Sequence, residues 1–291
     1  MASTETSSTA FINTTTAAAF IPEQWSKDAI VARKQRTVFA MNVNKQYKSD
    51  LKVGDIVNVP SINHLSAART KTTRTAITYD AITEDTTQIT VSTHNYSAIA
   101  VESLAKLQSN IDQQRAYADE MGYALDLAVD DALAALVDAF TQSVGSLAAD
   151  LTYDDLLDAI QYLDDANAPQ DSRLVIASPA SHNNFAKLDK FIHADYAILR
   201  NSDGQTGDSS RGFIGSWMGM PFFKTTNVDG TNAAGHDNVM MHKEALAMIQ
   251  QMEPTFESMR DTDYLVDKIA AQQVYGVKEM RDDHGVWLKG K

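Results

Sequence analysis

Apolar side chains recur every three or four positions from Leu104 to Phe140, and Asp, Glu, Gln and Arg fill the opposite face. That spacing predicts one long amphipathic helix, ended by Gly145 and Ser146. A helix well beyond the usual three turns is typical of a spine against which a sheet packs. Gly122 lies inside it at a cost of about 1 kcal/mol relative to Ala, which predicts a close contact or a kink.

The region before this helix has a different pattern, in which Thr, Val and Ile alternate in short runs. Residues 53–59 and 88–92 are predicted strands, and residues 98–101 continue the second run. Pro60 ends the first strand, and a Thr-rich connection joins the two. The pattern therefore predicts a long two-stranded excursion that is too extended to bury itself within one subunit.

The second half of the chain alternates helical and strand patterns. Thr152 and Asp155 are spaced as a capping box, so a helix should start there and stop before Pro169. Ser178 and Pro179 open a further helix through Leu188. Strands are predicted at 173–177, 221–226, 239–241, 245–249, 269–276 and 285–288. Together these elements indicate an α+β fold.

The first residues carry little that could form a core. Residues 1–19 are almost all Ser, Thr, Ala and Asn, so we expect a flexible arm. Order should begin near Phe20, and Pro22 with Glu23 suits the first turn of a short helix. We therefore expect an N-terminal helix region at 20–46.

Charge is distributed unevenly over the 291 residues. Lys and Arg number 25 against 38 Asp and Glu, a net charge of −13 that argues against a protein built to grip phosphate backbones. No acidic residue lies between Asp55 and Asp80, where Arg69, Lys71 and Arg74 sit at the expected tip of the excursion. Either this is a solvated polar loop, or its three cations contact the acidic surface of another copy of the chain.

The sequence contains no recognisable motif for catalysis or cofactor binding. Cysteine is absent, which excludes disulfides, Cys-ligated metals and thiol nucleophiles. Ser178 beside His182 has no nucleophile-elbow motif around it, so we interpret it as a helix cap. No window holds about 18 uninterrupted apolar residues, which predicts a soluble protein with no membrane contact. We predict no catalytic residue and no cofactor.

Metal ligation has little support either. The seven histidines are scattered, and His236, Asp237 and His242 are the nearest to a cluster, so we predict no metal site. The acidic pairs are adjacent residues that point different ways on a helix, and we interpret them as solvated faces. These pairs are 130–131, 154–155, 164–165 and 282–283.

Six stretches, in this order, resemble the major capsid proteins of tailed double-stranded DNA bacteriophages, the Hong Kong 97-type fold. They cover most of the chain after the arm. The stretches are FIPEQWSK at 20–27, KVGDIVNVP at 52–60, DEMGYALD at 119–126, RLVIASP at 173–179, GFIGSWMG at 212–219 and VYGVKEMR at 274–281.

The resemblance implies a role for each region. Residues 1–19 would be the N-terminal arm and 47–100 the extended loop, a β-hairpin that lies over an adjacent subunit. Residues 101–149 and 249–291 would form the peripheral domain, with its spine helix and closing strands. Residues 150–248 would form the axial domain, whose loops meet at the five- and six-fold positions of a shell.

The resemblance also implies partners and a location. The chain would self-assemble into the pentamers and hexamers of an icosahedral head, with a separate scaffolding protein, a portal protein and a possible decoration protein. It would assemble in the host cytoplasm, end in the virion and enclose DNA without sequence-specific binding. An acidic wall suits that task, because it does not hold DNA tightly.

Two other interpretations stay open. An encapsulin-like cellular shell has the same fold and would assemble around a cargo peptide without portal or genome. A soluble acidic enzyme or binding domain would need a pocket built from scattered residues.

Overall fold

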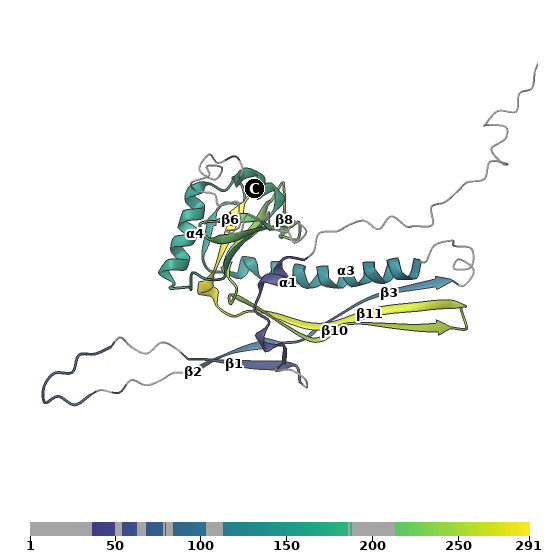
Figure 1. Cartoon of the computed structure of the whole chain (residues 1–291), viewed down its shortest axis with the longest axis horizontal. Coiled ribbons are helices and arrows are strands. Elements are labelled where there is room, and N and C mark those ends of the chain that lie inside the picture. The colour runs from purple at the N-terminus through teal and green to yellow at the C-terminus, as the bar shows by residue number, and fades with distance from the viewer. Residues whose placement is uncertain are drawn as a thin grey trace, which may run out of the picture.

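The computed structural model describes residues 37–49, 54–62, 68–77, 79, 84–102, 113–185, 187 and 213–291. Our predictions for the arm at 1–19 and for the helix starting near Pro22 lie outside these residues. Figure 1 shows an elongated molecule, with a compact end that holds α4, a long sheet beside α3, and a hairpin that projects from the base of that sheet.

Four α-helices and three 3-10 turns are described. The α-helices are α1 (Phe39–Asn42), α3 (Gln113–Ala134), α4 (Tyr153–Asp165) and α5 (Pro179–Phe185). The 3-10 turns are η2 (Gln46–Ser49), η3 (Val137–Ala139) and η5 (Asp282–His284).

The spine helix exists, but it ends earlier than its apolar pattern predicts. Helix α3 stops at Ala134, and after η3 the chain is extended at Phe140. Val137 and Phe140 are both buried in the main core, which explains why their spacing imitates a helical stripe. Gly145, which we placed at the helix end, closes strand β4 (Ser143–Gly145) with a φ of +78°. Residues 103–112 of the predicted helix lie outside the described part of the chain.

The long sheet packs against α3. It has the order β10–β11–β3, from β10 (Leu246–Asp261), β11 (Val266–Glu279) and β3 (Thr93–Glu102). Met121 and Leu125 of α3 bury Ala271 of β11, and the Gln273 side-chain amide donates to the Leu125 carbonyl at 2.7 Å. The helix is therefore fixed to the sheet by both apolar contact and a buried hydrogen bond.

Two predictions about this sheet need correction. Residues 245–249 were expected to form a short strand, but β10 runs for 16 residues. Its outer half is largely exposed, so it carries no clear burial pattern, and its pairing shifts register on both sides of Met252. Strand β3 was expected to continue the excursion, but it pairs with β11 along its whole length.

The compact end is built on a seven-stranded sheet of order β4–β12–β9–β5–β7–β6, with β8 pairing β9. Its other strands are β5 (Arg173–Ala177), β6 (Phe213–Trp217), β7 (Met220–Lys224), β8 (Gly230–Thr231), β9 (Gly235–His242) and β12 (Gly285–Gly290). All five residues of β5 are buried, which explains the continuous apolar run that predicted this strand.

Strand β12 belongs to the closing segment 249–291, but it does not pair with the strands of the long sheet. It pairs antiparallel with β9 and parallel with β4 in the seven-stranded sheet, and Val286 and Leu288 join the core there. A short strand next to a polar 3-10 turn has no sequence feature that identifies its neighbour, because pairing partners are set by tertiary packing.

The capping box before α4 is confirmed. The Thr152 hydroxyl accepts from the Asp155 backbone N–H at 3.2 Å, and the Asp155 carboxylate accepts from the Thr152 N–H at 2.8 Å. The proline start of α5 is also confirmed, with Pro179 as its first residue, while Leu188 lies outside the described residues.

Candidate functional site

The excursion is a hairpin of β1 (Ile56–Ile62) and β2 (Glu84–Thr90), paired antiparallel from Ile56 opposite Thr90 to Ile62 opposite Glu84. We call these strands and their connection the extended hairpin. Figure 1 shows the described part of the connection, residues 68–77, lying away from the rest of the molecule. Every residue from 68 to 77 is exposed, so this described part of the connection buries nothing against its own subunit.

The three predicted cations lie together on this exposed segment, which we call the basic tip (Arg69, Lys71 and Arg74). A tight turn shapes it, because the backbone N–H and the hydroxyl of Thr75 both donate to the Thr72 carbonyl, at 3.3 and 2.6 Å. Arg74 has a φ of 67°, in the left-handed region. The basic tip therefore exposes positive charge at the end of the extended hairpin.

The base of the extended hairpin is held firmly. Ile89 and Val91 form a buried cluster with Ala247 and Ile249 of β10, and Ile89 is fully buried. Gly276 of β11 lies beneath the hairpin, where an added Cβ would approach the Thr90 carbonyl oxygen to 2.3 Å. The hairpin is thus anchored to the long sheet at one end and exposed at the other.

The far end of the long sheet exposes large apolar side chains. Tyr264 and Leu265, in the turn between β10 and β11, are 75% and 59% exposed. Met259 of β10, near this turn, is 66% exposed. Exposed apolar side chains in one region are typical of surfaces that contact another protein.

Asp130 has a buried structural role that the sequence analysis did not predict. We interpreted the pair Asp130 and Asp131 as a solvated face, but Asp130 is fully buried in the core. Its carboxylate accepts from the backbone N–H of Val38 at 2.9 Å, from that of Ala40 at 2.8 Å, and from the Asn227 side-chain amide at 3.0 Å. It joins α1, α3 and the chain after β7.

The serine beside His182 has a structural task, as predicted. The Ser178 hydroxyl accepts from the Ser181 backbone N–H at 3.1 Å, and the Ser181 hydroxyl accepts from the Asn238 amide at 2.9 Å. These hydrogen bonds cap α5 and fix it to β9. Separately, burial lowers the pKa of His182 on the same helix, and nearby Lys224 adds to that shift.

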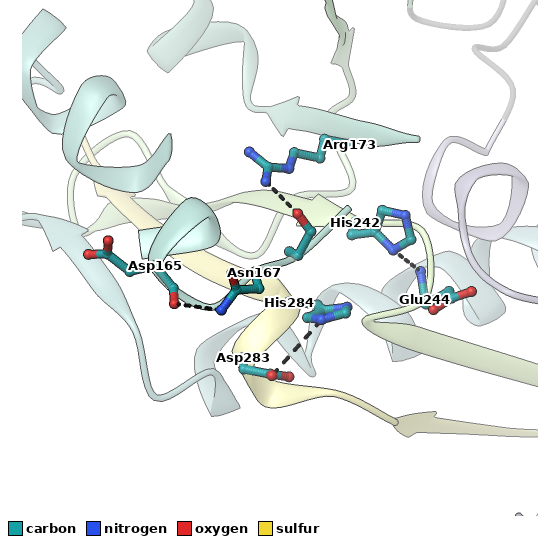
Figure 2. A network of polar contacts seen from close by, with 8 residues as sticks. Asp165, Asn167, Arg173, His242, Glu244, Asp283 and His284 are labelled. Atoms are coloured by element: carbon teal, nitrogen blue, oxygen red, sulfur yellow. Dashed lines mark hydrogen bonds and ion pairs between the residues drawn. The ribbon is translucent and has the colours of Figure 1, made fainter. Parts of the chain in front are cut away.

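The predicted neighbours His236, Asp237 and His242 serve separate contacts. His236 bonds Asn232 at 2.9 Å, and the Asp237 carboxylate accepts from the Trp287 indole at 2.9 Å. His242 instead lies with Glu244 and His284, whose ligand atoms are all within 4.8 Å of one another. This is the one such group of His, Cys, Asp or Glu within the described ranges, and Figure 2 shows it. The sequence analysis missed it because His284 is distant along the chain.

One carboxyl titrates far from its ordinary range. Burial raises the pKa of Glu279 from 4.5 to about 7, and the charge of Asp282 and a hydrogen bond to it act in the same direction. Asp282 also accepts from the Thr141 backbone N–H at 2.7 Å, so this predicted solvated acid has a structural contact. The pair lies where β11 ends and η5 begins.

None of the helices within the described ranges has both the length and the apolar character to cross a membrane. The chain matches no protein-family model and no curated protein sequence.

Solved structures do match, over nearly the whole chain. A chain of Mycobacterium phage Che8 superposes with a TM-score of 0.75 at 23% identity, covering 96% of this chain and 98% of that one. A chain of the capsid of cyanophage P-SCSP1u gives 0.73 at 16% identity, covering 94% of each. A chain of the mature capsid of bacteriophage PhiM1 gives 0.65 at 14% identity, covering 92% and 91%. The chain therefore has the Hong Kong 97-type fold of tailed-phage capsid proteins, as its six stretches indicated.

Proposed function

We propose that this chain is a major capsid protein, a structural subunit that self-assembles into the icosahedral shell around a packaged double-stranded DNA genome. The observation that carries the proposal is the match to capsid chains over more than nine tenths of both partners.

The exposed features of the subunit support assembly as the task. The extended hairpin is anchored at its base by Ile89 and Val91 and bears exposed residues at its end. A hairpin that is anchored at its base and exposed at its tip is suited to reach a neighbouring copy. The exposed apolar side chains around Tyr264 are a second surface that another subunit would cover.

Charge supports contact between copies. The basic tip carries three cations on a chain of net charge −13, so the acidic surface of a neighbour is its natural partner. Exposed ion pairs contribute only about 0.2–1 kcal/mol each. Repetition around a closed shell multiplies them, because each contact made holds the next pair at high effective concentration.

The same proposal extends to partners and location. Assembly would use a scaffolding protein and a portal protein in the host cytoplasm, with a decoration protein as an optional addition, and the shell would become part of the virion. The seven-stranded sheet would form the axial part and the long sheet with α3 the peripheral part. The subunit would have no enzymatic role.

Sedimentation of the purified protein tests the proposal. The chain is expressed alone and together with its scaffolding protein, and both preparations are examined by sedimentation velocity. We expect fast-sedimenting closed particles in at least one preparation. Particles that form without scaffold, portal or genome and enclose a cargo peptide would identify an encapsulin-like shell instead.

A further inference from the structure

Three metal-binding side chains meet where the seven-stranded sheet joins the long sheet. His242 is the last residue of β9, Glu244 lies in the turn that leads to β10, and His284 ends η5 just before β12. Their ligand atoms all lie within 4.8 Å of one another. Two imidazoles and one carboxylate are a donor set that Zn²⁺ uses in sites with three protein ligands and one open position.

Both rings are buried, and the ring of His284 has a nitrogen whose bonding capacity is unused. His242 and His284 are each 4% exposed, and their rings meet edge to face with centroids 5.7 Å apart. The Nδ1 atom of His284 is buried and has no hydrogen-bond partner among the described residues. A buried polar atom without a partner costs free energy, and a metal ion would give this atom a partner.

A carboxylate lies behind the ring of His284. Its Nε2 lies 3.9 Å from an oxygen of Asp283. An Nε2–H directed toward that carboxylate leaves the lone pair on Nδ1, the same atom that lacks a partner. A carboxylate behind a ligating histidine is a common feature of zinc sites.

His242 makes one contact that a metal would have to replace. The Glu244 backbone N–H donates to His242 Nδ1 at 3.3 Å, which is longer than a good N–H···N hydrogen bond. Binding through Nδ1 displaces this bond, and binding through Nε2 moves the ring proton to Nδ1 and also ends it. In both cases the metal competes with one weak hydrogen bond.

Two of the three side chains line a cavity that opens to solvent. The cavity, of about 420 Å³, is lined by His242 and Glu244 together with Asn44 and Asp171. It can admit an ion and a water molecule for the fourth coordination position. Lys45 and Lys243 also line the cavity and oppose Asp171, so binding must come from the direct ligand bonds rather than from a general acidic field.

We propose that His242, Glu244 and His284 bind one divalent transition-metal ion, for which Zn²⁺ fits the donor set. The ion would link the end of β9 to the start of β12 and so hold the two sheets at their junction. Because the ligands come together only in the folded chain, binding would stabilise the fold.

The test uses the full-length purified protein after treatment with a chelator. Co²⁺ is added as a spectroscopic probe, and Zn²⁺ is added in parallel thermal unfolding scans. We expect one ion per chain, a visible d–d absorption of the strength typical of four-coordinate Co²⁺, and a higher Tm with Zn²⁺ but not with Mg²⁺. Absence of both the absorption and the Tm shift in the unmodified protein would overturn the proposal.

Variants locate the site. His284→Gln and Glu244→Gln should abolish the Co²⁺ spectrum, and Asp283→Asn should weaken binding by about 10- to 100-fold. His94→Gln, on the exposed face of β3, is the matched control and should bind as the unmodified chain does. Unchanged binding in Glu244→Gln and His284→Gln would also overturn the assignment. If a histidine variant fails to fold, the Co²⁺ spectrum of the unmodified chain still decides.

Discussion

The carboxylate of Asp130 accepts a hydrogen bond from the backbone N–H of Val38 at 2.9 Å, across 92 residues of chain. The same carboxylate accepts from Ala40 and Asn227, so one buried side chain satisfies three donors. A buried donor that is left without an acceptor costs free energy. The first described helix is therefore fixed to the spine helix by hydrogen bonds that cannot be lost without destabilising the fold.

Replacement of Asp130 by Ala should lower the free energy of unfolding by roughly 2–4 kcal/mol, because three donors lose their acceptor in a buried place. Urea unfolding of the purified protein measures the loss. Asp131→Ala is the control, since Asp131 is exposed and should change stability by less than about 0.5 kcal/mol. Equal effects of the two variants would contradict the role given to Asp130.

Truncation of Ile89 should loosen the base of the extended hairpin. Ile89 is fully buried among Val91, Ala247 and Ile249, so Ile89→Ala should cost about 2–5 kcal/mol. Urea unfolding and limited proteolysis of the hairpin report the effect. Ile77→Ala on the exposed connection is the control, because this side chain is 56% exposed and should leave stability unchanged.

The two glycines that lie near the long sheet should respond oppositely to alanine. At Gly122 an added Cβ would lie 3.6 Å from Phe256, an ordinary contact, so Gly122→Ala should be tolerated and raise stability by up to about 1 kcal/mol. At Gly276 the Cβ would meet the Thr90 carbonyl oxygen, so Gly276→Ala should destabilise the hairpin. Thermal unfolding of the two variants measures this, and a loss of stability at Gly122 would contradict the first expectation.

Glu279 should make stability depend on pH. Its pKa is about 7 in the folded chain against 4.5 ordinarily, so the folded state binds more protons between these values. The contribution of Glu279 to stability therefore falls as pH rises from about 4.5 to about 7. Glu279→Gln cannot ionise and should remove that fall. Denaturation at several pH values measures it, with Glu257→Gln on exposed β10 as the control; an unchanged pH profile in Glu279→Gln would contradict the assignment.

Reversal of the basic tip should reduce assembly. Substituting Glu for Arg69, Lys71 and Arg74 changes the net charge from −13 to −19 and turns attraction to an acidic neighbour into repulsion. The fraction of protein in particles, measured by sedimentation, should fall, while the unfolding free energy of the subunit should not. Particles of normal yield and stability would reject the role of the tip. A control with the same net charge reverses Lys187, Lys278 and Lys291, which are exposed and lie outside the extended hairpin.

Much of the fold follows from local patterns. Strand β5 could be predicted because burial on both faces demands a continuous apolar run, and α4 because its capping box satisfies exposed backbone groups locally. The outer half of β10 could not be predicted, because exposed residues on both faces leave no alternation to detect. The end of α3 was misplaced because Val137 and Phe140 are buried after the helix as well as within its pattern.

The contacts of Asp130, and that between His242 and His284, could not be predicted from the sequence for a different reason. The partners of Asp130 are mainly backbone N–H groups, which every residue type except proline carries, so no sequence signature announces them. His242 and His284 meet only because β9 and β12 pair. The position of the basic tip could be predicted, because a long stretch without Asp or Glu in an acidic chain is visible without any tertiary information.

Cryo-electron microscopy of the purified protein, with and without its scaffolding protein, tests the central claim most directly. The account predicts closed icosahedral shells of pentamers and hexamers, in which the extended hairpin of each subunit lies over an adjacent one and the basic tip faces carboxylates. A monodisperse monomer under all conditions would contradict it.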